Sequence, residues 1–347
     1  MILFHIDSGL GNQMLAYCEY LALKKSNPGE DIYTETLVYE IPECDKTISQ
    51  WNGFELERVF GLKIPNLKDL LSEKDYQYVK DCLVKSEFWR KNWNYSPYVT
   101  KALTDIGCNL ENMCQINNEH PQKSAIKSFF DKSRQVQLLK YYYLRHKQIT
   151  DTKAYVNQYN HKTYLFGKYH DAYLGQRFSF IFRDNGIEQI KKDDILKSFV
   201  FPEIKDERNR QLASMLRSTN SVAIHARRGD MLGRTWVYYQ GGYFKRAVGY
   251  IKKHVDSPVF YFFCDPGSSE WCMKNLNIFG LTKNVDNINF VTWNKGNDSF
   301  RDMQLMSYCK HNIITNSSFG WWGAYLNTNP DKITCTPDWA YNSTNHF

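Results

Sequence analysis

The sequence predicts an α/β protein built on parallel sheets, and three observations carry this prediction. The first is an apolar run at residues 2–6 that passes through a glycine turn into a helix-like segment. The second is the alternation of apolar, strand-length runs with helical patterns between residues 221 and 336, which is typical of a parallel sheet covered on both faces. The third is that each polar motif of interest follows such a run, where parallel sheets bind ligands.

In chain order, the expected elements begin with the strand at 2–6 and a helix in which Leu15, Cys18 and Leu21 recur at three-residue spacing. Two further helices are expected near 66–74 and 124–134. A polar, proline-containing stretch around residues 197–210 is expected to separate two domains, at 1–200 and 201–347. In the second domain, the expected strands are 221–225, 258–264, 288–293, 311–315 and 332–336, and the expected helices are 244–255, 271–276, 299–310 and 320–327.

The composition is that of a packed globular protein. The chain has 347 residues, of which 42% are hydrophobic and 23% are charged, and this excludes a disordered chain, a collagen and a coiled coil. The net charge of +7 suits an anionic small ligand, but acidic and basic residues are interleaved, so we expect no nucleic-acid partner. Aromatic residues make up 16% of the chain. They either stack on the sugars and bases of a ligand or belong to an ordinary aromatic core and surface.

Cysteine usage and the absence of targeting signals indicate a cytoplasmic protein. The nine cysteines contain no C-x-x-C pair, which predicts reduced thiols rather than a disulfide framework or a zinc site. The first residues lack the basic region of a signal peptide, and no stretch approaches the roughly 20 apolar residues of a membrane span. Because D-x-D and H-E-x-x-H sequences are absent and the histidines are scattered, we expect no metal site.

The strongest chemical signal is the sequence HARRGD at residues 225–230, directly after an expected strand. Arginine suits phosphate because its planar guanidinium offers two donors at once and stays charged. Adjacent arginines at a strand end predict that one of Arg227 and Arg228 enters a ligand crevice while the other meets a carboxylate, for which Asp230 is the candidate. The alternative is a solvated pair of surface arginines.

A second signal is the sequence TNSSFGWWG at residues 315–323, where a strand is expected to run into a helix. The first N–H groups of a helix are unpaired and carry the positive end of its dipole, which favours anions. Ser317 and Ser318 would add hydroxyl donors to such a cradle, between Asn316 and Phe319. The alternative is an ordinary serine N-cap.

Two further features are weaker on their own. The sequence GLGNQM at residues 9–14 begins like a dinucleotide fingerprint but has methionine at the third glycine position. It therefore indicates only a close backbone approach to a ligand near Gly11 and Asn12. Asp302, on an expected helix facing the crevice, could accept two N–H bonds from a guanine edge, or could be an ordinary solvated carboxylate.

Together these segments resemble one family, the α-1,2-fucosyltransferases of glycosyltransferase family 11. The resemblance rests on GLGNQM at 9–14, HARRGD at 225–230, DMQLMS at 302–307 and NSSFGWWGA at 316–324. It implies a GT-B-like fold of two Rossmann-like lobes with parallel sheets and an interlobe cleft, the acceptor-side lobe at 1–200 and the GDP-fucose-binding lobe at 201–347. The implied reaction is a metal-independent, inverting transfer of L-fucose to the 2-hydroxyl of a terminal galactoside. GDP-fucose is the donor substrate, and no other cofactor is implied.

The resemblance also implies roles for the residues singled out above. Guanine or ribose is recognised by His225 and Asp302. Arg227 and Arg228 bind the diphosphate and Asp230 braces them, so these three are the expected catalytic residues. The resemblance implies that the rest of the donor-binding site consists of Gly11, Asn12, Asn316, Ser317, Ser318 and Phe319. The expected partners are GDP-fucose and a galactose-terminated oligosaccharide, with no transmembrane segment but with room for a peripheral membrane contact.

The sequence departs from the family on the acceptor side. The residues before GLGNQ read Asp7-Ser8, where family members tend to carry glycine, and no motif identifies the base that an inverting reaction needs. Asp7 and Asp171 are the two candidates for that base. Two alternatives stay open: a transferase that uses another nucleotide sugar or forms another fucose linkage, and a non-catalytic protein that binds a nucleotide sugar or glycan.

Overall fold

The computed structural model describes residues 1–47, 51–91, 93–113, 133–150, 168–174, 190–229 and 232–337. The chain forms two compact units, one of residues 1–120 and 160–201 and the other of residues 121–159 and 202–347. Each unit contains a sheet in which every described strand pair is parallel. The predicted α/β class, with a parallel sheet in each of two units, is confirmed, and the GT-B-like assignment stays a prediction. The cleft between the lobes stays a prediction.

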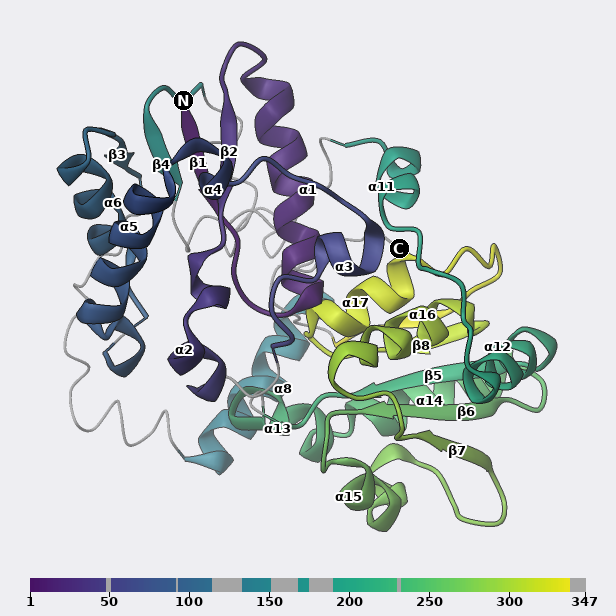
Figure 1. The fold of residues 1–347 in the computed structure, drawn as a ribbon. Helices are drawn as coiled ribbons and strands as arrows, with labels where there is room; N and C mark the ends of the chain where they lie inside the picture. The colour runs from purple at the N-terminus through teal and green to yellow at the C-terminus, as the bar shows by residue number, and fades with distance from the viewer. Residues whose placement is uncertain are drawn as a thin grey trace. The chain divides into compact units, whose positions relative to one another are not determined.

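The first unit is built on a four-stranded sheet in the order β2-β1-β4-β3. β1 (Ile2–His5) pairs with β2 (Ile32–Glu35) and with β4 (Ala172–Leu174), and β4 pairs with β3 (Glu111–Asn112). β1 is buried along its whole length, as expected of an apolar strand covered on both faces. α1 (Leu10–Ser26) begins directly after the glycine turn, which confirms the predicted strand, turn and helix (Figure 1).

Two hydrophobic cores cover the two faces of this sheet. Ile2 and Phe4 pack on one face against residues of α1, and Leu3 packs on the other face against residues of the later helices. This alternation follows from the two-residue period of a strand. The helical segments of the unit after α1 are η1 (Leu37–Glu40), α2 (Pro42–Thr47), α3 (Leu56–Phe60), α4 (Leu67–Leu70), α5 (Glu73–Ser86), η2 (Phe88–Arg90), α6 (Ser96–Asp105) and α11 (Lys192–Ser198).

The prediction of one helix over residues 66–74 is wrong, because two helices meet there. Asn66 caps α4, with its side chain accepting the N–H of Lys68, and Leu71 then leaves the helical conformation with a ψ of 152°. Ser72 caps α5 in turn, since its hydroxyl accepts the N–H of Asp75. Two capping residues this close stop one helix and start the next. The expected helix at 124–134 lies outside the described residues except for its last two positions.

The second unit is built on a five-stranded parallel sheet in the order β7-β6-β5-β8-β9. The five strands predicted from the C-terminal half are confirmed, with shorter bounds for most of them. They are β5 (Ser221–Ala226), β6 (Val259–Cys264), β7 (Asn287–Val291), β8 (His311–Ile313) and β9 (Thr334–Cys335). All six residues of β5 are buried, as expected for the central strand of a covered sheet.

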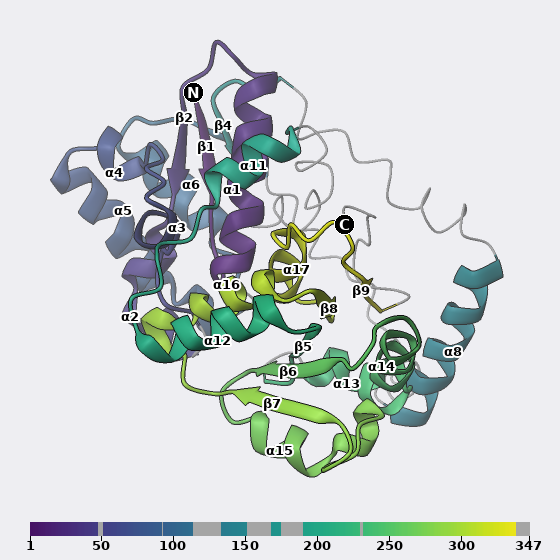
Figure 2. The same ribbon diagram turned by 90° about the vertical axis from the view of Figure 1, so that its right-hand side faces the viewer.

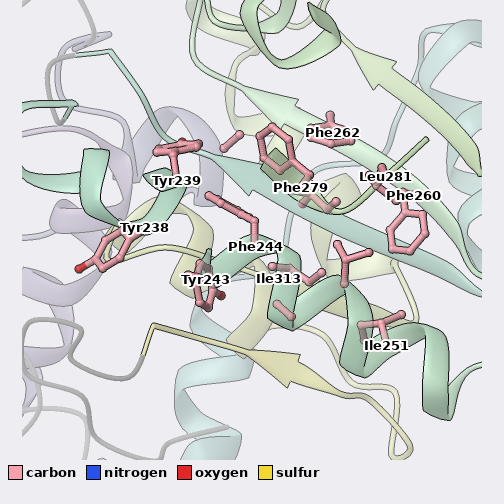
Figure 3. Close-up of a cluster of buried hydrophobic side chains, with 14 of the residues drawn as sticks. Tyr238, Tyr239, Tyr243, Phe244, Ile251, Phe260, Phe262, Phe279, Leu281 and Ile313 are labelled. Carbon is pink, nitrogen blue, oxygen red and sulfur yellow. The ribbon is translucent and has the colours of Figure 1, made fainter. Parts of the chain in front are cut away.

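Helices cover this sheet, and α14 closes a hydrophobic core on one of its faces. Phe244 and Ile251 of α14 pack with Phe262 of β6 and with Phe279 in a core rich in aromatic rings (Figure 3). The four helices predicted in this half are confirmed within a few residues, whereas α12 and α13 were not predicted. The helical segments are α12 (Glu207–Ser218), α13 (Leu232–Gln240), α14 (Tyr243–His254), α15 (Ser269–Lys274), η4 (Leu276–Phe279), η5 (Gly296–Asp298), α16 (Phe300–Tyr308) and α17 (Ser318–Tyr325).

The chain enters the second unit at Pro202, close to the predicted start of the C-terminal lobe, but one earlier segment also packs there. α8 (Arg134–Thr150) lies next to α13, and its Tyr141 is fully buried in the core of the second unit (Figure 1). The roles assigned to the two lobes stay predictions. Among the described residues, no helix is both long and apolar enough to cross a membrane.

Candidate functional site

The topology of the second unit locates a candidate site before any side chain is considered. The chain builds β6 and β7 on one side of β5 and then returns to build β8 and β9 on the other side. Open parallel sheets bind ligands outside the carboxyl ends of their strands, where the strand order reverses. Here that point lies between β5 and β8, which pair through Ile224 and Ile313. The two strongest sequence signals therefore follow neighbouring strands.

Asp265 holds the arginine loop after β5 in place. It directly follows β6 and is only 5% exposed. Its Oδ1 accepts a hydrogen bond from Nη1 of Arg227 at 2.5 Å, and its Oδ2 accepts the backbone N–H groups of Arg228 and Gly229, the latter at 2.7 Å. The predicted carboxylate against one arginine is thus present, but Asp265 supplies it. Asp230, the residue expected there, lies outside the described residues.

The second arginine rests on aromatic rings. Cζ of Arg228 lies 3.2 Å from the ring centroid of Trp271 and 5.1 Å from that of Tyr239. The hydroxyl of Tyr239 donates to the carbonyl of Arg227 at 3.0 Å, so the same ring also supports the loop. Among the described residues, no carboxylate pairs with the Arg228 guanidinium. Trp271 and Tyr239 therefore position a cation whose charge is available to an anionic ligand.

The loop after β8 ends in an open helix N-terminus. Ser317 has an extended backbone and its side chain makes no capping bond to α17, while its carbonyl accepts the N–H of Trp321 at 2.9 Å. The N–H groups of Ser318, Phe319 and Gly320 consequently have no partner within the helix. With the hydroxyls of Ser317 and Ser318 beside them, these groups form the kind of cradle that binds a phosphate.

His225 and Gly320 bring the two loops into direct contact. A Cβ atom at Gly320 would lie 2.4 Å from Nδ1 of His225, so only glycine permits this approach. The ring of His225 also lies 5.8 Å from that of Phe319. Burial lowers the pKa of His225 to about 4, so its imidazole is neutral at neutral pH. It can recognise a ligand through hydrogen bonds but not through charge.

Several buried polar atoms at this edge lack partners. Nδ1 of His225, Oγ1 of Thr315 and both side-chain amide atoms of Asn316 have no hydrogen-bond partner in the part of the chain that the structure describes. Buried polar atoms in folded proteins are nearly always paired with protein groups or with water. Their concentration beside the arginine loop and the α17 N-terminus indicates a place that a polar ligand completes.

Asp302 lies in the first turn of α16, at the same edge of the sheet. Its Oδ1 accepts a hydrogen bond from Nδ2 of Asn294 at 2.7 Å, and Asn294 in turn accepts one from Asn209 at 2.8 Å. Burial raises the pKa of Asp302 to about 7, because one amide donor does not offset the loss of water. This carboxyl is suited to a ligand that brings N–H donors of its own.

Asp302→Asn is expected to stabilise the protein more as pH rises. The carboxyl ionises near pH 4 in the unfolded chain but near pH 7 in the folded protein. As pH rises between these values, the wild type therefore loses up to about 4 kcal/mol of its free energy of unfolding. Asparagine avoids this cost and can keep the bond from Asn294. Urea unfolding should therefore show a stability difference between the two proteins that is about 3 kcal/mol larger at pH 8 than at pH 5.

Asp298→Asn is the matched control, since this exposed carboxyl ends the turn before α16. It removes one charge from the same region and should change stability little at either pH. An equal difference between Asp302→Asn and the wild type at both pH values would contradict the assignment of a buried, protonated carboxyl.

Gly11 and Asn12, the remaining predicted residues, lie in the first turn of α1 in the other unit. Both belong to the carboxyl edge of the first unit's sheet, since the turn that contains them follows β1. Oδ1 of Asn12 is buried without a hydrogen-bond partner among the described residues, which fits a role toward a ligand. This turn and the site of the second unit belong to different compact units of the chain.

The two candidates for the base lie at opposite edges of the first unit's sheet. Asp7 follows β1, at the carboxyl edge, and is 6% exposed. Asp171 precedes β4, at the amino edge, where its carboxylate pairs with the N-terminal ammonium of Met1 at 3.1 Å. Because ligands bind at carboxyl edges of parallel sheets, the geometry favours Asp7 and gives Asp171 a structural partner instead.

Asp7 belongs to a buried array of polar side chains. Its Oδ2 lies 3.5 Å from Nε2 of His5, and Nδ1 of His5 lies 2.6 Å from Oε2 of Glu35. Oδ1 of Asp7 accepts the hydroxyl of Ser8 at 2.9 Å. These two carboxylates, one near each ring nitrogen, hold the imidazole in place. Such an array can hold Asp7 in one orientation toward an acceptor.

Sequence reasoning missed Asp265, Trp271 and Asn294. A signal existed for Asp265 and Asn294, because each follows an expected strand within a few residues, as the residues singled out from β5 and β8 do. Trp271 carried no such signal, since its role comes from contact with an arginine more than 40 residues earlier in the chain. Among the described residues, no group of three His, Cys, Asp or Glu side chains could hold a metal ion.

Comparison with known proteins agrees with this geometry. The family model described as Glycosyl transferase family 11 matches residues 181–346, which contain the arginine loop, Asp302 and the α17 N-terminus. The matched residues make up slightly less than half of the chain. The predicted resemblance to that family is thereby confirmed.

Two curated proteins with similar sequences carry names that agree with this resemblance. An α-1,2-colitosyltransferase of Escherichia coli is 37% identical over 134 residues, which cover 37% of this chain and 43% of the relative. A galactoside α-(1,2)-fucosyltransferase 1 of Sus scrofa is 33% identical over 115 residues, covering 32% and 30%. The chain thus matches less than half of the length of these curated relatives. The solved fucosyltransferase NodZ from Bradyrhizobium aligns with 93% of this chain and 91% of its own, at 10% identity and a TM-score of 0.44.

Proposed function

We propose that this protein is a glycosyltransferase of family 11 that moves L-fucose from GDP-fucose to the 2-hydroxyl of a terminal galactoside, with inversion at the sugar carbon. One observation carries the proposal: an arginine pair braced by Asp265 and the open N-terminus of α17 follow neighbouring strands at the point where the strand order reverses. This arrangement suits a diphosphate, because it offers fixed cations and N–H donors together.

The chemistry needs a stabilised leaving group. The bond between the sugar carbon and the β-phosphate oxygen breaks while the acceptor oxygen forms the new bond from the opposite side. Negative charge then grows on the departing GDP, and Arg228 with the α17 N-terminus would stabilise it electrostatically. These groups do the work that a metal ion does in other transferases. We therefore propose a metal-independent reaction with the nucleotide sugar as the only small-molecule partner.

Recognition of the nucleoside is assigned to His225 and Asp302. The neutral imidazole of His225 can donate or accept one hydrogen bond without repelling the arginines. Asp302 can accept the two N–H groups on the guanine edge, and those donors would favour its ionised form. A uracil offers no such pair of adjacent donors, so this assignment favours guanosine over uridine diphosphates.

A donor and acceptor screen tests the proposal. Purified protein is incubated with GDP-fucose and lactose or N-acetyllactosamine, and the linkage in the product is determined. We expect an α-1,2 product whose formation survives EDTA. Donor binding without transfer or donor hydrolysis would support a non-catalytic nucleotide-sugar-binding protein instead, and a preference for UDP over GDP would remove the role of Asp302.

A second donor has specific support, because the E. coli relative is named a colitosyltransferase. Colitose is fucose without the 3-hydroxyl, so the two sugars differ by one polar group at the site. The screen therefore includes GDP-colitose beside GDP-fucose. A higher kcat/KM with GDP-colitose would make the chain a colitosyltransferase that uses the same diphosphate site. A cytoplasmic location for either activity remains a proposal.

Asp7→Asn is expected to lower kcat by about 10²–10⁴-fold, the usual contribution of a general base, because we propose that Asp7 takes the proton from the acceptor hydroxyl. Binding of GDP, measured by calorimetry, should stay within a small factor of the wild type. Asp171→Asn is the control, as this carboxylate lies at the opposite edge of the same sheet. Normal turnover by Asp7→Asn would exclude it as the base.

A further inference from the structure

The inner face of α8 is fixed on the second unit. Tyr141 is fully buried, and its hydroxyl accepts a hydrogen bond from Nη2 of Arg246 at 2.8 Å. The indole N–H of Trp236 donates to Oε1 of Gln137 at 2.5 Å, one turn earlier on the same face. A Cβ at Gly241 would lie 2.6 Å from the Tyr141 ring, so this helix packs as closely as the backbone allows. The orientation of α8 is therefore set.

The outer face of α8 exposes large apolar and aromatic side chains. Leu139 is 70% exposed, Tyr143 is 64% exposed and Tyr142 is 45% exposed. At offsets of three and four residues these side chains lie on one side of the helix, opposite Tyr141. A single exposed leucine is ordinary, but a stripe of leucine and tyrosines exposed on one helix face is not explained by packing alone, although the Tyr142 ring also contacts that of Tyr141.

The charged residues in the sequences of α8 and α14 are all basic. The sequence of α8, RQVQLLKYYYLRHKQIT, contains no acidic residue, and its Arg134 and Lys140 are exposed. The sequence of α14, which contacts α8 through Arg246, also contains no acidic residue. Its exposed face carries Lys253, and Tyr250 there is 51% exposed. Figure 2 shows α8 and α14 at the same side of the second unit.

We propose that the outer face of α8 lies on the surface of an anionic membrane. A helix with a basic, polar flank and a leucine and tyrosine face is the pattern of an interfacial helix. Leu139 would enter the acyl boundary, the tyrosines would lie at the level of the headgroups, and Lys140 would meet lipid phosphates. The inference concerns a surface outside the diphosphate site and does not rest on the proposed function.

Charge and chemistry favour this occupant over others. A second copy of the chain would bring the same acid-free helix and a net charge of +7 to the interface, so like charges would oppose the pairing. A nucleic acid would use the basic side chains but would leave Leu139 exposed. An anionic lipid surface satisfies both the positive charge and the apolar stripe.

Sedimentation with lipid vesicles tests the proposal. The full-length protein is mixed with vesicles of phosphatidylcholine alone, or of phosphatidylcholine with phosphatidylglycerol, at low and high salt. We expect binding to the mixed vesicles, weakened by salt and nearly absent on phosphatidylcholine. The double variant Leu139→Glu with Tyr143→Glu should lower the partition coefficient at least about tenfold, and Lys140→Glu alone should lower it severalfold.

The matched control is Val200→Glu with Val285→Glu, which introduces the same two charges at apolar positions that are 66% and 79% exposed elsewhere. Its partition coefficient on the mixed vesicles should stay within about twofold of the wild-type value, because the two added negative charges lie away from α8 and are screened by salt. Equal binding to both vesicle types, or unchanged binding by the α8 variants, would overturn the proposal. So would a wild-type dimer that the α8 variants dissociate.

Discussion

Replacing Asp265 with asparagine is expected to lower both the affinity for GDP and the rate of transfer by about 10²-fold or more. The carboxylate is buried and receives Nη1 of Arg227 and the N–H groups of Arg228 and Gly229. Removing one partner of a buried ion pair costs up to about 3–5 kcal/mol, and here the Arg227 side chain, which is 21% exposed, would lose its compensating charge. The amide would also turn an N–H donor toward groups that are donors themselves.

Calorimetric titration with GDP and initial rates with GDP-fucose measure the effect. Asp286→Asn is the control, since Asp286 pairs with Lys252 at 2.6 Å in the same unit but lies just before β7, at the amino edge of the sheet. Its removal should leave GDP binding within about twofold of the wild type, because Asp286 lies at the edge of the sheet opposite the candidate site. An Asp265→Asn variant that binds GDP as the wild type does would contradict the proposed brace.

The sequence predicted the second unit well because its strands are covered on both faces. Such strands appear as continuous apolar runs: β6 is apolar or aromatic throughout, and β5 is apolar except for Ser221 and His225. Because these runs alternate with helical patterns, the strands are expected to be parallel, and their carboxyl ends then share one edge of the sheet. Arg228 and Ser317 could be placed at one edge for this reason, without any knowledge of their contacts.

Other features depended on contacts that a linear pattern does not contain. The first unit has short helices whose limits are set by local caps, such as Ser72, and the single helix expected at 66–74 failed for that reason. α12 was missed because a polar stretch was interpreted as a linker, although Asp206 at its start and the apolar Leu212 and Leu216 have a helical pattern. The stacking of Arg228 on Trp271 arises only in the folded chain.

Arg228→Ala is expected to lower kcat by about 10²–10³-fold, the scale found for removal of one preorganised group that stabilises a developing anion. The effect should appear mainly in kcat, since charge on the leaving β-phosphate is larger in the transition state than in the bound donor. Arg228→Lys should recover only part of the loss. Lysine restores the charge but lacks the planar fork and the flat contact that Trp271 offers to the guanidinium.

Arg217→Ala is the matched control for this variant. Cζ of Arg217 lies 3.8 Å from the ring centroid of Tyr308, so the mutation also removes a stacked guanidinium, but Arg217 precedes β5 and lies at the amino edge of the sheet. Its kcat should stay within about threefold of the wild type, because surface substitutions away from special features have small effects. Near-normal turnover by Arg228→Ala would show that another cation stabilises the leaving group. Loss of wild-type activity in EDTA would show that a metal ion does so.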